Sequence, residues 1–163
     1  MKKMYSASIT VFVLLIVIAF SGCTSSSNNS SSSEPTKTYS ANGVSFNYPE
    51  SWQVNDTAST IKVTNPQTQN AVLIMKSPIA DMQTLANKRV ETTTDKIVSD
   101  NNLTVNGVSA REITIDKDTT KEIVTYIQAK SDLVYSVTYM APQSDFDSMK
   151  ITFNTIVNSF KAQ

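Results

Sequence analysis

Apolar and polar residues alternate over several short segments of the chain, a period of two that is typical of strands with one buried face. Residues 44–48 (VSFNY) and 61–63 (IKV) follow this pattern. Residues 71–75 (AVLIM) are apolar at every position, which favours a central strand covered on both faces. The turn-forming segment 65–70 (NPQTQN) separates the last two. We therefore predict that the folded part of the chain begins with antiparallel strands.

Two asparagine–glycine pairs mark hairpin turns. Asn42 and Gly43 stand between two alternating segments, and Asn106 and Gly107 stand in the same position further along the chain. Asn-Gly is favoured where both central residues of a tight turn need a positive φ. Each pair therefore predicts a hairpin between its flanking strands.

Apolar residues spaced by threes and fours predict a long helix over residues 78–99. Ser77 suits the N-cap, and Pro78 suits the first helical position, where its missing N–H is no loss. The stripe expected to face the sheet consists of Ile79, Met82, Ala86, Val90, Thr93 and Ile97.

Three further strands are predicted at residues 108–116, 121–130 and 133–140, joined by tight turns. Within 108–116 the apolar positions change parity, from even numbers at its start to odd numbers at its end. Because a one-residue slip exchanges the two faces of a strand, we predict a bulge near Arg111 and Glu112.

A second helix is predicted over residues 145–160, with Ser144 as N-cap. Asp145 and Asp147 lie in its first turn, where the helix dipole favours negative charge. Its apolar face consists of Phe146, Met149, Phe153, Ile156, Val157 and Phe160.

The predicted order is strands, a long helix, three strands and a final helix. Strands joined by tight turns pair antiparallel, and two helices can cover opposite faces of one sheet. The expected fold class is α+β, with an antiparallel sheet of about six or seven strands flanked by helices on both faces.

The segment VSFNYPESWQV at 44–54, this element order and the closing FDSMKITFNTIVNSF at 146–160 resemble the PsbP and Mog1-like family. The resemblance covers most of residues 37–161. It implies an αβα sandwich around an antiparallel sheet.

The N-terminus has the layout of an export signal. Lys2 and Lys3 precede the apolar run 9–20, and small residues then precede Cys23, the only cysteine in the chain. This resembles a lipoprotein signal, whose cysteine becomes the lipid-modified first residue of the mature protein. The alternative is an uncleaved membrane anchor over residues 4–22, close to the roughly 20 residues that span a bilayer.

Three parts of the chain follow from this pattern: a signal peptide at 1–22, a flexible linker at 23–36 and one α+β domain at 37–163. The linker is rich in serine and asparagine, with no apolar residue after its cysteine, so it cannot offset the entropy of ordering. Under either interpretation of the N-terminus, the domain is exported and held at the membrane.

Composition excludes several function classes. One cysteine allows no intramolecular disulfide, and the absence of histidine excludes Ser-His-Asp and Cys-His catalysis as well as imidazole zinc sites. Without the two lysines of the signal, 12 basic and 14 acidic residues leave a net charge of −2. This near balance gives no reason to expect nucleic-acid binding. We expect no enzyme activity, cofactor or metal.

Two short motifs resemble chemical signatures by chance. Ser59 and Lys62 fit S-x-x-K, and residues 99–101 fit S-D-N, as in penicillin-binding acyl enzymes. However, residues three apart on a strand point to opposite faces, and no K-T-G follows. Asp116 and Asp118 raise the question of calcium, but the spacing of an EF-hand loop is absent, so a solvated turn is favoured.

Four aromatic residues are candidates for either packing or ligand contact. Trp52 follows a predicted strand, and we favour a core role for it over stacking on a ligand. Tyr126, Tyr135 and Tyr139 could line a pocket, but strands favour tyrosine for packing alone.

The expected function is that of a non-catalytic binding or assembly module for a membrane or envelope complex. The protein would be lipid-anchored through Cys23 on the extracytoplasmic side of the cell membrane, with a protein partner in the envelope. The resemblance favours this interpretation, because PsbP-like proteins act as extrinsic subunits and Mog1-like proteins bind other proteins. The alternative is a surface lipoprotein that binds a small ligand in a tyrosine-lined pocket. The sequence assigns no residue to the partner or ligand site.

Overall fold

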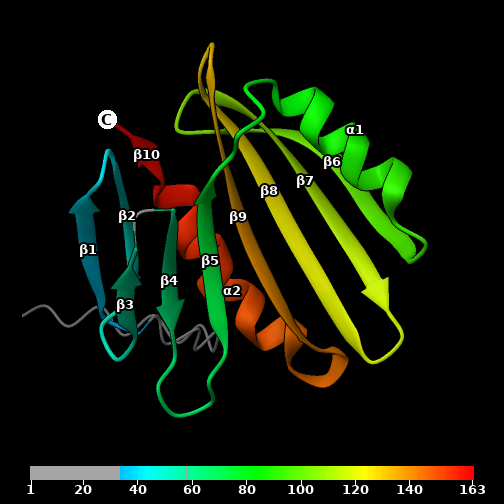
Figure 1. The fold of residues 1–163 in the computed structure, drawn as a ribbon. Helices are drawn as coiled ribbons and strands as arrows, with labels where there is room; N and C mark the ends of the chain where they lie inside the picture. The colour runs from blue at the N-terminus through cyan, green and yellow to red at the C-terminus, as the bar shows by residue number, and fades with distance from the viewer. Residues whose placement is uncertain (1–33, 58) are drawn as a thin grey trace, which may run out of the picture. The chain divides into compact units, whose positions relative to one another are not determined.

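The computed structural model describes residues 34–57 and 59–163, which form strands and two helices (Figure 1). In chain order the elements are β1 (Thr36–Ala41), β2 (Val44–Pro49), β3 (Gln53–Asp56), β4 (Thr60–Thr64), β5 (Ala71–Lys76), α1 (Met82–Thr92), β6 (Lys96–Val105), β7 (Val108–Lys117), β8 (Thr120–Lys130), β9 (Leu133–Pro142), α2 (Gln143–Ser159) and β10 (Lys161–Ala162).

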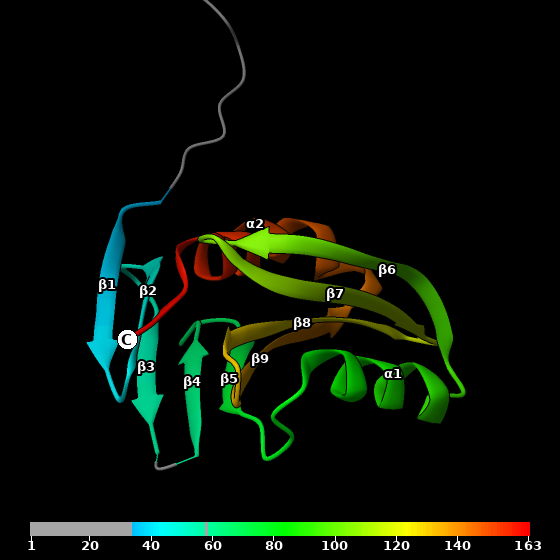
Figure 2. The same cartoon turned by 90° about the horizontal axis from the view of Figure 1, so that it is seen from above.

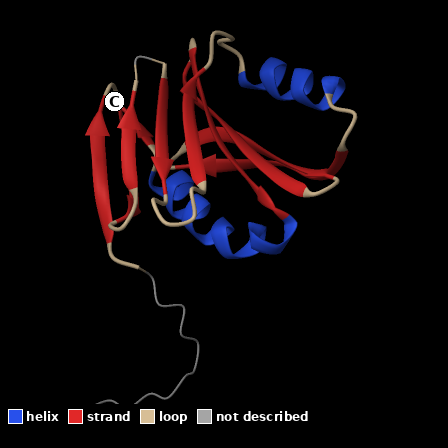
Figure 3. Ribbon diagram, turned by 60° about the horizontal axis from the view of Figure 1, so that its bottom comes forward, coloured by secondary structure: helices blue, strands red, loops and turns tan. Residues whose placement is uncertain are grey.

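The strands form two sheets in which every pairing is antiparallel. The larger sheet has seven strands in the order β3-β4-β5-β9-β8-β7-β6, and the smaller has three in the order β1-β2-β10. Strand β10, at the end of the chain, therefore lies beside the first hairpin, and the C-terminus is marked next to the outermost strands in Figure 3. The prediction of an α+β fold built on an antiparallel sheet is confirmed.

Both asparagine–glycine turns are confirmed. Asn42 and Gly43 have φ of 50° and 77°, and Asn106 and Gly107 have φ of 47° and 85°. The positive φ at both central positions matches the right-handed twist of the two strands that each turn joins. The first turn connects β1 to β2, and the second connects β6 to β7.

Strand β5 is less enclosed than predicted. Val72 and Ile74 are buried, but Leu73 is only half-buried and Met75 is 38% exposed. The prediction of two covered faces is therefore wrong, because α1 leaves one face of β5 open to solvent.

The predicted helix at 78–99 is wrong at both ends. Ser77 does not cap a helix; instead, its hydroxyl accepts a hydrogen bond from the N–H of Ile79 in a local turn. Helix α1 begins later, after Asp81, whose carboxylate caps it by accepting from the N–H of Thr84 at 2.6 Å. It ends at Thr92, and the following residues form strand β6, in which Ile97 pairs with Ile115.

No bulge occurs near Arg111 and Glu112, where the register with both neighbouring strands is regular. The parity changes because different parts of β7 belong to different cores. Ala110 belongs to the core cluster that contains α2, whereas Ile113 and Ile115 belong to the cluster that contains α1. The start of β7 therefore buries one face of the strand and its end buries the other face, with no change in the register of pairing.

Helix α2 begins two residues earlier than predicted. Pro142 occupies the N-cap position without a side-chain hydrogen bond, and the hydroxyl of Ser144 instead donates to Asp145. The predicted apolar face is otherwise confirmed, because Phe146, Phe153 and Phe160 are at most 3% exposed. This face anchors the end of the chain to the sheet.

The core consists of two clusters. The larger joins α2 to β2, β4, β5, β8 and β9 and to the residues of β6 and β7 beside their connecting turn, and the smaller joins α1 to β7, β8 and β9. Figure 2 shows α1 and α2 well apart, with β8 and β9 between them. The larger cluster carries most of the apolar burial, so the sheet and α2 form the framework that positions every surface described below.

Candidate functional site

Several predicted features lie outside the described residues. Cys23, the signal peptide at 1–22 and most of the linker at 23–36 belong to this part of the chain, so the structure does not bear on lipidation. Between residues 34 and 163, none of the helices has the length and apolar character needed to cross a bilayer.

The aromatic candidates all lie in the protein interior. Trp52 is 5% exposed and belongs to the larger core cluster, which agrees with the packing role that we favoured. Tyr135 and Tyr139 belong to the same cluster, whereas Tyr126 belongs to the cluster of α1. The structure therefore separates Tyr126 from the other two tyrosines, and no single pocket collects all three.

Tyr139 is unusual among the buried residues. It is 1% exposed, and its hydroxyl oxygen is the only fully buried side-chain nitrogen or oxygen atom among the described residues that has no hydrogen-bond partner. Burial, together with the nearby negative charge of Asp145, raises the pKa of Tyr139 to about 12. The phenol is therefore neutral at physiological pH.

The two acyl-enzyme fragments are far apart. Ser59 precedes β4, and Lys62 lies exposed within it, whereas residues 99–101 lie on β6 at the opposite edge of the seven-stranded sheet. Asp100 is held by Arg111 through two hydrogen bonds of 2.7 Å. The fragments therefore form no common site.

Asp116 and Asp118 lie at the β7–β8 turn. The side-chain amide of Gln143 donates both to the carboxylate of Asp116 and to the backbone carbonyl of Asp118. Lys117, between them, pairs with Glu122. Within 34–57 and 59–163 no group of three acidic or cysteine residues has the arrangement of a metal site. These contacts support the interpretation as a turn.

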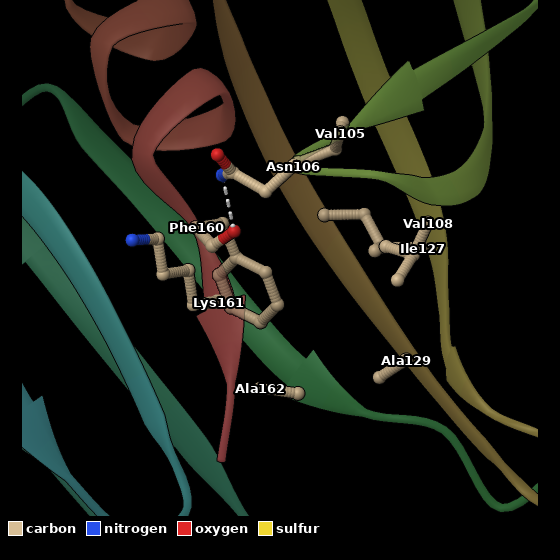
Figure 4. A pocket seen from close by; sticks show the side chains of 8 residues that line it. All are labelled: Val105, Asn106, Val108, Ile127, Ala129, Phe160, Lys161 and Ala162. Atoms are coloured by element: carbon tan, nitrogen blue, oxygen red, sulfur yellow. Dashed lines mark hydrogen bonds between the residues drawn. The ribbon is translucent and has the colours of Figure 1, made fainter.

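An open groove lies beside β10, with a volume of about 450 Å³. We call it the β10 groove (Figure 4). Its walls come from the β6–β7 turn, the end of β8 and the C-terminal residues, and they consist of Val105, Asn106, Val108, Ile127, Ala129, Phe160, Lys161 and Ala162. Most of these side chains are apolar, but polar atoms make up the larger share of the exposed lining, so the groove suits a peptide segment that offers both backbone hydrogen bonds and an apolar side chain.

Asn106 closes one end of the groove. Its side-chain amide donates to the carbonyl oxygens of Asn158 at 2.9 Å and Phe160 at 2.8 Å. The last carbonyls of a helix lack intrahelical partners, so these two bonds satisfy the C-terminal end of α2. The sequence predicted Asn106 only as a turn residue, and nothing local indicated a contact 54 residues away.

The backbone of β10 forms another edge of the groove. The N–H of Gln163 donates to the carbonyl of Gly43, so this residue faces β2. Because successive residues of a strand direct their N–H and C=O groups to opposite sides, those of Ala162 point away from β2. Ala162 lines the groove, and its backbone is therefore available to an extended segment of a partner.

The face that carries α1 holds two polar clusters. Arg111 binds Asp100 and also donates to Gln83 and Asn87 of α1. The hydrogen bonds from Arg111 hold the pKa of Asp100 below its ordinary value, against an opposing effect of burial. This cluster ties α1 to the edge of the sheet.

In the second cluster, Arg89 and Lys117 both pair with the same carboxylate oxygen of Glu122. Glu122 is 9% exposed, so its charge is compensated in a largely buried setting. Neither cluster contains a nucleophile placed next to a base.

Comparison with protein families gives one match, to a family described as PsbP-like protein, over residues 9–162. This chain belongs to the PsbP-like proteins. No curated protein sequence matches it.

Solved structures support the fold of this PsbP-like chain. The solution structure of cyanobacterial PsbP from Synechocystis sp. PCC 6803 matches with a TM-score of 0.60 and 12% identity, covering 84% of this chain and 98% of that one. A crystal structure from Bacteroides thetaiotaomicron VPI-5482 matches with a TM-score of 0.51 and 12% identity, covering 74% of this chain and 45% of that one. At such low identity the likeness concerns the fold alone.

Proposed function

We propose that this protein is a lipoprotein held at the extracytoplasmic side of the cell membrane through Cys23. Its PsbP-like domain acts as a non-catalytic binding or assembly module for a membrane or envelope complex. The short apolar run and the single cysteine at its end support the anchor. A flexible linker would raise the concentration of the domain near partners in the same membrane.

The β10 groove is the observation that carries this proposal. It combines apolar walls with an unpaired backbone edge at Ala162, the two features by which a sheet accepts an extended peptide. A partner segment can hydrogen-bond to the outer edge of β10 and place an apolar side chain against Val108 and Ala129. The family resemblance supports the same role, since it implies assembly with larger complexes.

Site-specific crosslinking in intact cells tests this role. A photoreactive amino acid at Ala129 lies in the groove, whereas one at Val98, which is 51% exposed, lies near the start of β6, at the opposite end of that strand from the groove residue Val105. We expect a distinct membrane-associated product from position 129 and none from position 98. Identical products from both positions would contradict a partner site in the groove.

A pair of substitutions at Ala162 separates backbone pairing from packing. Ala162→Pro removes the N–H that points into the groove but keeps the bond from Gln163 to Gly43, whereas Ala162→Val keeps both. We expect the product from position 129 to be lost in the proline variant and kept in the valine variant. Equal yields in the two variants would show that no strand is added to β10.

We also infer the layer order helix, sheet, helix for the domain. Alternation along β8 supports it, because Ile123 and Ile127 belong to the cluster of α2, whereas Val124 and Tyr126 belong to the cluster of α1. In such a sandwich, α2 and the β10 groove lie on the face opposite α1. The face that carries α1 is then free to hold a second ligand.

A further inference from the structure

A second pocket lies on the face that carries α1, between that helix and β5. We call it the Tyr126 pocket; its volume is about 360 Å³, within the range of about 300–1,000 Å³ typical of small-molecule sites. Its apolar walls include Met75, Leu85 and Val124. Met75, Ser136 and Tyr126 form one row across β5, β9 and β8, because Met75 pairs with Ser136 and Ser136 pairs with Tyr126.

Three polar side chains converge on this pocket from buried positions. Glu122, Tyr126 and Ser136 are 9%, 7% and 8% exposed, and all three line it. Among residues 34–57 and 59–163, the hydroxyls of Tyr126 and Ser136 have no hydrogen-bond partner, yet neither is fully enclosed as the hydroxyl of Tyr139 is. Both hydroxyls therefore reach solvent through the pocket, where they remain available to a ligand.

The charge of Glu122 is already compensated. Its Oε2 accepts a hydrogen bond of 2.7 Å from Arg89 and also pairs with Lys117. Neither Arg89 nor Lys117 lines the pocket. The carboxylate of Glu122 can therefore accept a hydrogen bond from a ligand while its negative charge is already neutralised by these two cations. Burial raises the pKa of Tyr126, which keeps its phenol neutral and able both to donate and to accept.

We propose that the Tyr126 pocket binds an uncharged, mainly apolar molecule that carries a hydroxyl group. The hydroxyl donates to the carboxylate of Glu122 and accepts from the phenol of Tyr126, while the apolar part packs against Met75, Leu85 and Val124. Ser136, the cross-strand partner of Tyr126, offers a further hydrogen-bond donor.

Charged head groups fit this pocket less well. An ammonium would become a third cation beside Arg89 and Lys117, and a carboxylate would face the oxygens of Glu122. Lys76 also lines the pocket, but it is exposed and keeps its own hydration, so it offsets little of the hydration that a buried carboxylate would lose and adds to the repulsion of an ammonium. A hydroxyl avoids both costs.

Four small probes of equal framework test this inference: 4-ethylphenol, ethylbenzene, 4-ethylbenzoate and 4-ethylbenzylamine. Their binding is measured by NMR titration, with the affected backbone amides assigned. We expect 4-ethylphenol to bind most tightly and to shift the amides of Leu85, Tyr126 and Ser136. Tighter binding of the carboxylate or the amine, or shifts confined to the β10 groove, would overturn the proposal.

Matched variants locate the site. Met75→Trp fills the mouth of the pocket from an exposed position, whereas Ile151→Trp introduces the same side chain on α2, outside the lining, at a residue that is 66% exposed. We expect binding of 4-ethylphenol to be lost in the first variant and unchanged in the second. The same loss in both would mean that the phenol binds elsewhere.

Tyr126→Phe tests the hydroxyl itself. No hydrogen bond to the described residues is lost in this variant, so the fold should be kept, and affinity for 4-ethylphenol should fall roughly fivefold while that for ethylbenzene stays the same. Tyr48→Phe, outside the pocket, serves as control. An unchanged affinity of Tyr126→Phe for the phenol would remove this residue from the site.

Discussion

The side-chain amide of Asn106 lies 2.8 Å from the carbonyl oxygen of Phe160, to which it donates a hydrogen bond. Together with its second bond, to Asn158, it joins the β6–β7 turn to the end of α2. One asparagine therefore has two roles, since its positive φ makes the turn and its amide fixes the C-terminal segment beside the β10 groove.

Replacing Asn106 by glycine separates these roles. Glycine accepts the positive φ of the turn, so only the two hydrogen bonds are lost. We expect the free energy of unfolding, measured in urea, to fall by about 1–2 kcal/mol. Asn42→Gly is the matched control, because the amide of Asn42 bonds to Asp56 at an exposed position. Equal losses in the two variants would mean that Asn106 does not hold α2.

Tyr139→Phe should leave the protein as stable as the wild type or make it more stable, by up to about 1 kcal/mol, because it removes a buried hydroxyl without a partner. Tyr39→Phe should instead be destabilising, because the hydroxyl of Tyr39 donates to Asp56. Thermal and urea unfolding of both variants check this contrast. A clear loss of stability in Tyr139→Phe would reveal a partner for the hydroxyl, such as an internal water.

Stability should fall at alkaline pH. Burial is the main cause that raises the pKa of Tyr39 and of Tyr139 to about 12, from an ordinary value of 10.0. In both residues the unfolded chain loses its proton first, so stability is complete below pH 10 and is lost as the pH rises toward 12. We expect Tyr139→Phe to lose less stability than the wild type between these values.

Acid should act through the pair of Asp100 and Arg111. Because the pKa of Asp100 is lowered in the folded protein, the stability that this carboxylate contributes is present above about pH 4 and is lost as the pH falls through its folded value. Asp100→Asn should cost about 1 kcal/mol at pH 7 and reduce the loss of stability on acidification. If Asp100→Asn has the stability of the wild type at pH 7 and loses as much of it on acidification, the ion pair contributes nothing to stability.

Cys23→Ser should abolish incorporation of a radiolabelled fatty acid and, once the signal is removed, release the protein from membranes. Cell fractionation and metabolic labelling check both outcomes. A serine variant with its signal removed that still sediments wholly with membranes would contradict the lipid anchor. Retention of residues 1–22 on the mature protein, read by mass spectrometry, would favour the uncleaved anchor.

Local chemistry was enough to predict much of the fold. The Asn-Gly pairs at 42–43 and 106–107 correctly predicted two hairpins, because few other dipeptides favour positive φ at adjacent positions. The apolar face of α2 was also clear, since its phenylalanines repeat at helical spacing over four turns. These signals need only a short window of sequence.

The first part of strand β6, before the segment 103–105 that flanks the predicted hairpin, was missed because its pattern depends on distant partners. Ile97 continues the helical spacing of Met82 and Ala86, yet it pairs with Ile115 in the sheet. Residues 99–102 (SDNN) suit a turn more than a strand, and they are held there by contacts such as that between Asp100 and Arg111. Tertiary context overrode local propensity.

Neither pocket could be found from the sequence. The β10 groove requires Ala162 to lie near Val108, and the Tyr126 pocket requires Met75, Ser136 and Tyr126 in one row. Both relationships depend on the register of strands far apart in the chain. From the sequence we identified only Tyr126 as a residue that could line a pocket.

The position of β10 affects the order of assembly when such a chain is delivered N-terminus first. The hairpin of β1 and β2 obtains its third strand from Lys161 and Ala162, and Gln163 closes the ladder at Gly43. Contacts between residues so far apart in the sequence slow folding, because the long loop between them must close before they form. In the export that we propose, the first hairpin would therefore remain with one edge of β2 unpaired until the final residues emerge, and in that interval it would be open to chaperones or to aggregation.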